Sequence, residues 1–242
     1  MRFNEKDLRD VHRALSIEKE IPPGIAQREI DTVQGTDGEI IAQERIEKDE
    51  YIVRVNIACR CADDAWDVRA KLAGWAQLNR PGTAELIPTH WIGKCYDARL
   101  KAISAPEFVR GFGKVEMRFL LPRPIARDIA PSMASGAGGM SALIGGTYVC
   151  RPTIGQTIRN AREGLTISMD GEPFLVLTGA LAAGQRVEMD TQRERLTIDG
   201  EDAMSRINYV FSRWRPGFTP GRHEIISEDD GALEMRWHNE WV

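Results

Sequence analysis

One glycine-rich stretch, Ser132 to Gly146, most constrains how this chain of 242 residues can fold. It carries five glycines, no charged residue and no apolar repeat of period 2 or 3.6, and three prolines lie within the ten residues before it. Glycine loses the most backbone freedom on ordering and proline has no backbone donor, so this composition is typical of a connector. A phosphate-binding loop would need a Lys-Ser or Lys-Thr pair opening a helix, and the stretch has none. We therefore predict two domains, residues 1–131 and 147–242, joined by a linker at 132–146.

The composition is that of an ordinary soluble globular protein. Hydrophobic residues make up 42% of the chain and charged residues 28%, with a net charge of −4 and a pI near 5.7. These values exclude disorder along the whole chain and give no basic surface for binding a polyanion. No run of about 20 apolar residues could span a membrane, and the opening MRFNEKDLRD lacks the apolar core of a signal peptide. We expect a protein that is made in the cytosol and is soluble there.

Alternation of apolar and polar residues predicts a sheet in the first domain. In the segment Glu50–Ala58, Tyr51, Val53, Val55 and Ile57 point one way and the residues between them point the other. Asp37-Gly38 suits a tight turn, which predicts a hairpin within Arg28–Ile41. Further strands are predicted at Thr83–Ile87, Cys95–Ile103 and Lys114–Leu121. The first domain is therefore expected to be α+β, with a mostly antiparallel sheet.

One helix of about 16 residues is predicted between these strands, because Ala65, Val68, Leu72 and Trp75 recur at helical spacing. Asp63 and Asp64 lie where a helix N-terminus favours negative charge, and Asn79-Arg80-Pro81-Gly82 is a stop signal. We expect the helix to cover one face of the sheet, with both of its tryptophans, Trp66 and Trp75, in the core.

The second domain has denser turn signals and no long helical stripe. Asp170-Gly171, Asp199-Gly200 and Asp230-Gly231 each follow an apolar-alternating run. Strands are predicted around Leu165–Met169, Phe174–Leu177, Val187–Met189 paired with Leu196–Ile198, Ile207–Phe211, His223–Ile226 and Leu233–Trp237. Many short strands at regular spacing favour a β-sandwich or jelly roll.

A search for catalytic and metal-binding patterns gives mainly absences. Cys59-Arg60-Cys61 is one residue too short for a zinc pair, and we expect Cys59, Cys61, Cys95 and Cys150 to be free thiols. His223-Glu224 begins like a metalloprotease motif, but Ser227 occupies the position of the second histidine. The acidic run Glu228-Asp229-Asp230 could supply glycosidase carboxylates, although a charged turn explains it more simply. No catalytic residue, cofactor or metal is predicted, and the chain is not expected to be an enzyme.

Two tryptophans are not assigned to the core by the sequence pattern and could contact a ligand. Trp214 lies between Arg213 and Arg215, a cluster that could contact a sugar or a nucleic acid, and Trp241 stands near the end of the chain.

The order of parts, a sheet with one helix, a glycine-rich seam and then a β-sandwich, resembles the distal tail protein of long-tailed bacteriophages. The opening Arg2-Phe3-Asn4 with Asp7-Leu8, and the run from Glu107 to Leu120, resemble the family's ring-forming domain. The stretch Gly179–Gly200 resembles the middle hairpin of its galectin-like C-terminal domain, and the segments Pro220–Ile225 and Leu233–Trp241 resemble the closing strands. The resemblance covers nearly the whole chain.

This resemblance implies a structural protein of the virion tail tip, assembled in the host cytoplasm. Family members form a homohexameric ring that joins the tail tube to tail-tip or baseplate hub proteins and sometimes to receptor-binding proteins. DNA passes through the lumen of such a ring without specific binding. An acidic net charge is compatible with such a conduit, since attraction to each phosphate would slow passage. No membrane contact is implied.

The alternative function is a carbohydrate-binding module that attaches the particle to host surface sugars, and a third is a sugar-active hydrolase. Galectins that bind sugars use a His-x-Asn-x-Arg strand and a Trp-x-x-Glu strand. Trp237 and Glu240 match the second spacing, but the sequence has no His-x-Asn-x-Arg. Trp237 also lies in phase with Leu233 and Met235, which predicts a buried ring. Trp237 and Glu240 are therefore the candidate residues that the sequence offers for a sugar site of the galectin kind, and they match one of the two galectin motifs.

Overall fold

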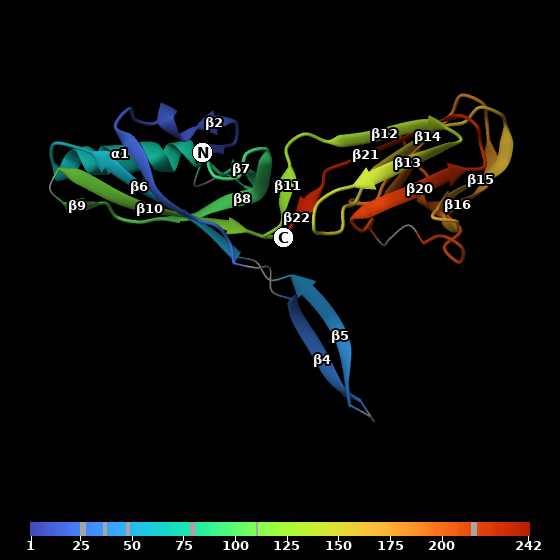
Figure 1. The fold of residues 1–242 in the computed structure, drawn as a ribbon, viewed down its shortest axis with the longest axis horizontal. Coiled ribbons are helices and arrows are strands. Elements are labelled where there is room, and N and C mark those ends of the chain that lie inside the picture. Colours follow the sequence, from blue (N-terminus) through green and yellow to red (C-terminus); the bar gives the residue numbers. More distant parts are fainter. Residues whose placement is uncertain (25–27, 36–37, 47–48, 78–80, 110, 214–216) are drawn as a thin grey trace. The chain divides into compact units, whose positions relative to one another are not determined.

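The computed structural model describes residues 1–24, 28–35, 38–46, 49–77, 81–109, 111–213 and 217–242 (Figure 1). The chain forms two compact units, Met1–Arg127 with Val242 and Asp128–Trp241. The predicted fold class is confirmed, because strands dominate and one α-helix is present among the described residues. None of the described helices is long and apolar enough to cross a membrane.

The first unit is built on an antiparallel sheet. Its strand order is β2 (Lys6–Asp7), β1 (Arg2–Phe3), β7 (Ala84–Ile87), β8 (Lys94–Ile103), β10 (Phe112–Leu121), β6 (Asp49–Ala58) and β3 (Leu15–Ile21). The short strand β9 (Glu107–Val109) pairs with β10, β11 (Ala126–Asp128) pairs with β8, and the 3-10 helix η1 spans Leu8–Asp10. The strands predicted from alternation lie at β6, β7, β8 and β10, within one or two residues of their expected bounds.

The helix α1 (Ala62–Trp75) buries Ala65, Val68, Leu72 and Trp75, the predicted stripe. It has 14 residues, and part of the predicted stop signal lies outside the described residues. The expectation that both tryptophans are core is correct for Trp75 but wrong for Trp66, whose side chain is 50% exposed. Trp66 lies beside the buried stripe and packs under the guanidinium of Arg69, 5.4 Å from the ring centroid.

A separate hairpin, β4 (Arg28–Gly35) and β5 (Gly38–Ile46), lies in sequence between β3 and β6. It forms a two-stranded sheet with Gly35 opposite Gly38. The hairpin is longer than the segment in which it was predicted, and Asp37 of the predicted turn lies outside the described residues.

The second unit is a β-sandwich of two antiparallel sheets. One sheet has the order β12 (Ser132–Ala137), β21 (Ala232–Trp237), β14 (Thr153–Thr157), β17 (Arg186–Asp190), β18 (Arg195–Ile198) and β19 (Glu201–Asp202). The other has the order β13 (Gly139–Ile144), β20 (Gly221–Ser227), β15 (Arg162–Met169) and β16 (Glu172–Leu181). The 3-10 helix η2 spans Met204–Arg206, and β22 spans Glu240–Trp241. One apolar core, contributed by both sheets, fills the sandwich.

The expected linker at 132–146 is replaced by β12 and β13, so that prediction is wrong, and the second unit begins at Asp128 rather than at residue 147. The chain passes here from one sheet of the sandwich to the other. A Cβ atom on Gly136 would lie 1.9 Å from the carbonyl oxygen of Gly139, and Gly138 has a φ of 68°. Glycine is needed here for close backbone approach and a left-handed turn, not for flexibility.

The predicted strand at Ile207–Phe211 is also absent. Ile207 forms one isolated bridge with Leu177, and the chain then turns, with the amide of Ser212 bonded to the carbonyl of Asn208 at 2.9 Å. The hairpin turns at Asp170-Gly171 and Asp199-Gly200 do form, with positive φ at all four residues.

Candidate assembly surface

The sheet of the first unit has one covered face and one open face. On β6, Val53, Val55 and Ile57 are fully buried on the covered face, where α1 packs. A Cβ atom on Gly113 of β10 would lie 2.8 Å from the Cβ of Ala65, so glycine lets the helix approach the sheet closely. The open face carries the alternate residues of the same strands and is a candidate surface of this unit.

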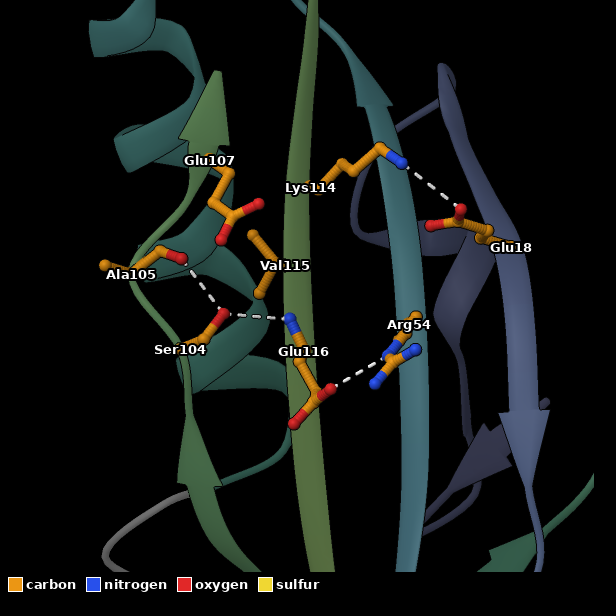
Figure 2. Close-up of a pocket in the computed structure, with 8 residues that line it drawn as sticks. All are labelled: Glu18, Arg54, Ser104, Ala105, Glu107, Lys114, Val115 and Glu116. Atoms are coloured by element: carbon orange, nitrogen blue, oxygen red, sulfur yellow. Dashed lines mark hydrogen bonds and ion pairs between the residues drawn. The ribbon is translucent and has the colours of Figure 1, made fainter. Parts of the chain in front are cut away.

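Ion pairs cross the strands of this open face (Figure 2). Arg54 Nε donates to Glu116 Oε2 at 2.8 Å, directly across the β6–β10 register, and Arg118 Nε donates to Glu116 Oε1 at 2.8 Å. Hydrogen bonds from Arg54 and Arg118 hold the pKa of the Glu116 carboxyl below its usual value. Lys114 Nζ donates to Glu18 of the edge strand β3 at 3.2 Å. The network thus links three adjacent strands.

A second acidic residue extends the network toward β8. Glu50 bonds Lys101 of β8 through Oε1 and lies 3.9 Å from Arg118 through Oε2. Cross-strand pairs of this kind contribute to the stability of a sheet, and exposed ones contribute little each. The main effect of these ion pairs is that the charged groups they join already have partners within the chain.

An open hollow of about 390 Å³ lies on the same face, and Figure 2 shows the side chains around it. Charged groups of both signs line it, among them Glu107, Lys114 and Glu116. The hydroxyl of Ser104 accepts from the Glu116 amide at 2.9 Å and donates to the Ala105 carbonyl at 2.9 Å. Small-molecule pockets are mostly apolar and enclosed, so this wide, charged hollow suits contact with another protein surface.

The edge strand β3 is held at one end by a buried carboxylate, Glu20, whose side chain is 6% exposed. Its oxygens accept from the Thr89 hydroxyl at 2.6 Å and the Tyr51 hydroxyl at 2.8 Å, and His90 Nδ1 lies 2.9 Å away. Burial alone would raise the pKa of Glu20, but the hydrogen bonds from Thr89, Tyr51 and His90 outweigh it and lower that pKa. These bonds hold the end of β3 to residues of β6 and of the loop after β7, on the side of the strand where it is paired in the described part of the chain.

Exposed apolar side chains gather where β9 and β10 meet. Phe112 is 50% exposed and pairs with Val109, also 50% exposed, while Phe108 is 41% exposed. Contiguous exposed apolar side chains often mark a contact site, so these residues add an apolar part to the candidate surface.

The predicted sugar-binding residues occupy the closing strands of the second unit. Trp237 is 4% exposed, lies in the core, and donates its indole N–H to Asn239 Oδ1 at 2.9 Å. The carbonyl of Glu240 accepts the amides of Thr147 and Tyr148 at 2.9 and 3.1 Å. The buried ring of Trp237 offers no face on which a sugar could stack.

A hydrogen-bond network instead closes this part of the second unit. The Asp128 carboxylate accepts the indole N–H of Trp241 at 2.9 Å and the side-chain N–H of Asn239 at 2.9 Å. Asn239 Oδ1 also accepts the backbone N–H of Gly145 at 2.8 Å. These bonds tie the first residue of the unit to its last strand, so Trp241 has a structural role.

The other polar residues considered for catalysis or metal binding also have structural surroundings. His223 lies between Asp170 Oδ2, 2.7 Å from Nδ1, and the Thr219 carbonyl, 2.8 Å from Nε2. Asp229 is 3% exposed and accepts backbone N–H groups, so it does not face a cleft. The cysteines are free thiols. In the ranges that the structure describes, no three His, Cys, Asp or Glu residues group to hold a metal ion.

Sequence reasoning missed the ion-pair network and one exposed apolar loop, Tyr209-Val210-Phe211. The network joins residues far apart in sequence, so no local pattern could reveal it. The loop had a signal, because the run Ile207–Phe211 does not alternate cleanly and therefore fits a strand poorly. Trp214 and Arg215 of the proposed aromatic cluster lie outside the described residues, and Arg213 pairs with Glu172.

Comparison with known proteins gives one family and one close fold. Residues 145–241 match the family model of the siphovirus-type tail component, C-terminal domain. The crystal structure of SPP1 Dit, described as a paradigm of the hub adsorption apparatus in phages that infect Gram-positive bacteria, has a TM-score of 0.77 and 14% identity. That match covers 100% of this chain and 98% of SPP1 Dit.

Two further structures match weakly. The phage P2 baseplate in its activated conformation with calcium has a TM-score of 0.42 and 9% identity, and the corresponding strontium structure has a TM-score of 0.41 and 10% identity. Each match covers 93% of this chain and 90% of the matched chain. No curated protein matches the sequence. The predicted resemblance to siphovirus distal tail proteins is confirmed: residues 145–241 match the model of the siphovirus-type tail component C-terminal domain, and the chain has the fold of SPP1 Dit.

Proposed function

We propose that this chain is a structural protein of a phage tail tip that forms a homohexameric ring. The ring joins the tail tube to the tail-tip or baseplate hub protein, carries receptor-binding proteins at its rim, and leaves a channel for DNA. The observation that carries this proposal is the fold shared with SPP1 Dit over the whole chain, together with the family match of the second unit.

The first unit has the kind of edge that a ring requires. Strand β3 pairs with β6 on one side, and no described strand pairs with its other side. An open strand edge presents backbone N–H and C=O groups that recruit a strand of another chain. A heterologous contact that closes after six copies uses these edges without growing into a fibre.

The hairpin β4–β5 supports the same proposal. Strands β3 and β6 pair directly, with Ile21 opposite Ile52, so the hairpin is an insertion that their pairing does not need. A two-stranded sheet alone is only marginally stable in water. Contact with a neighbouring copy would give this arm a partner.

The proposed channel agrees with the charge of the chain. A net charge of −4 gives no general attraction to phosphate, which is the term that dominates non-specific DNA binding. DNA passing through such a ring would not be held by it.

Light scattering and negative-stain imaging of the purified protein test the ring. The expected result is a sixfold particle with a mass six times the 27.1 kDa of the chain. Replacing residues 28–46 with a short Gly-Ser linker is expected to lower the hexamer fraction, while circular dichroism and the thermal midpoint of the rest stay close to wild type. A monomer at high protein concentration, both alone and with the tail tube protein, would overturn the proposal.

Carbohydrate binding receives no support from the geometry of Trp237. On a glycan array we expect no binding by the wild-type protein. Binding that disappears in a folded Trp237→Phe variant would reopen the alternative.

A further inference from the structure

The three consecutive residues Tyr209, Val210 and Phe211 form an exposed apolar loop in the second unit, beside β16 (Figure 1). Their side chains are 51%, 85% and 62% exposed. Single exposed apolar residues are normal on a protein surface, but a contiguous run of this size usually marks an interaction site.

The loop is fixed in place by hydrogen bonds to β16. The amide of Asn208 donates to the Val176 carbonyl at 2.9 Å, and the amide of Arg213 donates to the Phe174 carbonyl at 3.0 Å. The hydroxyl of Ser212 accepts the Val176 amide at 2.9 Å. A loop that is already ordered loses little conformational entropy when it binds, so its apolar side chains are preorganised for contact.

The loop's own turn adds to this order. Val210 donates its amide to Asn208 Oδ1 at 3.2 Å, and the Tyr209 hydroxyl donates to the Met204 carbonyl at 3.4 Å. A turn that merely connected η2 to β20 could carry polar residues at these positions at no cost. The apolar residues therefore need an explanation outside the fold of the chain.

The exposed area limits what can bind. With side chains of roughly 150–250 Å² each, the three residues expose about 350 Å². A stable interface buries about 800 Å² on each partner, so this loop alone is too small to hold a dimer of two copies.

We propose that the Tyr209–Phe211 loop is a docking knob for a different polypeptide of the tail tip, one that presents an apolar pocket and is engaged by several copies of the loop at once. This inference rests on the proposed ring, because six loops on one particle supply through multivalency the affinity that a single loop lacks. Aromatic side chains are the commonest anchors of such contacts.

Site-specific photo-crosslinking in assembled tails tests the inference. Val210 is replaced with benzoylphenylalanine, and Ile92, which is 92% exposed in the first unit, is replaced in a matched control. The expected result is one hetero-crosslink at position 210, at least tenfold stronger than any at position 92. A crosslink only to a second copy of the chain or to lipid, or none above the control, would overturn the inference.

Crosslinking in the same tails also distinguishes a failure of this inference from a failure of the proposed function. Tails that contain the chain but give no hetero-crosslink at position 210 refute the docking knob alone, whereas tails that lack the chain refute both proposals. Val210→Asp, in tails without the crosslinker, is expected to leave the chain in the tails and to lower the amount of the partner identified by crosslinking at least tenfold, and Ile92→Asp is expected to change neither amount. Because Val210 is 85% exposed, Val210→Asp should fold like wild type.

Discussion

Asp229 supports the second unit through a buried carboxylate, and its removal gives a sharp test of the structure. Its Oδ1 accepts the amides of Arg159 and Gly231 at 2.8 Å each, and Oδ2 accepts the amide of Asn160 at 3.4 Å. Arg162 Nη1 lies 3.7 Å from Oδ2. These contacts tie the loop after β14 to the turn before β21.

The expected cost of Asp229→Asn follows from these bonds. The amide oxygen can keep both Oδ1 bonds, but each changes from charged to neutral, a loss of about 1 kcal/mol for each bond. The new amide N–H would face the N–H of Asn160, which adds about 0.5–1 kcal/mol. The free energy of unfolding should therefore fall by about 2.5–3 kcal/mol, and Asp229→Ala should cost more because all three hydrogen bonds to the carboxylate are lost.

The pH dependence gives an independent check. Burial alone would raise the pKa of Asp229, but the backbone amides and Arg162 lower it. A carboxyl with a lowered folded pKa stabilises the protein fully above its unfolded pKa, about 3.9, and that stabilisation is lost as the pH falls through the folded pKa. The difference between wild type and Asp229→Asn should therefore be constant from about pH 7 to pH 5 and shrink below that.

Urea titration followed by hydrogen exchange of peptides from residues 153–198 isolates the second unit for this measurement. Asp230→Asn is the matched control, because Asp230 is exposed in the same turn, and it should change stability by less than about 0.5 kcal/mol. Equal stability of the two variants at pH 7, or a difference that does not shrink on acidification, would refute the role of the buried carboxylate.

Three further changes test other parts of the fold. Trp237→Phe removes the indole bond to Asn239 and should cost the second unit about 1–2 kcal/mol in urea unfolding. Gly136→Ala should cost about 3 kcal/mol or prevent folding, since its Cβ atom would lie 1.9 Å from the Gly139 carbonyl oxygen; soluble yield and the thermal midpoint report it. Glu20→Gln weakens three bonds to a buried carboxylate and should destabilise the first unit by about 2 kcal/mol, seen as faster hydrogen exchange in β3; unchanged exchange would contradict it.

Much of the fold could be predicted from the sequence because most of its strands have a local signature. The alternation predicted that the strand of Val187 and Met189 pairs across a turn with the strand of Leu196 and Ile198, and the register confirms this hairpin. The helix was equally clear, since its buried stripe repeats every three or four residues. Such patterns report which face of an element is buried, and burial is what the core of each unit then requires.

The prediction that residues 132–146 form a linker was wrong for a physical reason. Composition records how freely a backbone moves when it is alone, but Gly136 and Gly138 are needed by contacts that exist only in the folded sandwich. The same sequence therefore fits a linker and a pair of closely packed strands. Only the tertiary position of the Gly139 carbonyl decides between them.

The candidate surface was harder to predict because it is made by long-range register. Glu116 meets Arg54 across 62 positions of sequence, and Lys114 meets Glu18 across 96. Each charged residue looks alone like a solvated position of an alternating strand. The sequence predicted the wet face of the sheet but not the pairing on it.

That pairing also indicates where assembly energy would come from. Three carboxylates of the open face, Glu18, Glu50 and Glu116, already have cationic partners within the chain, so a neighbouring protein would gain little by replacing those pairs. The backbone groups on the outer side of β3 have no strand partner in the described part of the first unit, and Val210 has most of its side chain in water. We therefore expect strand pairing along the edge of β3 and burial of the Tyr209–Phe211 loop to stabilise the assembly that we propose, and the charged face to determine which partner fits.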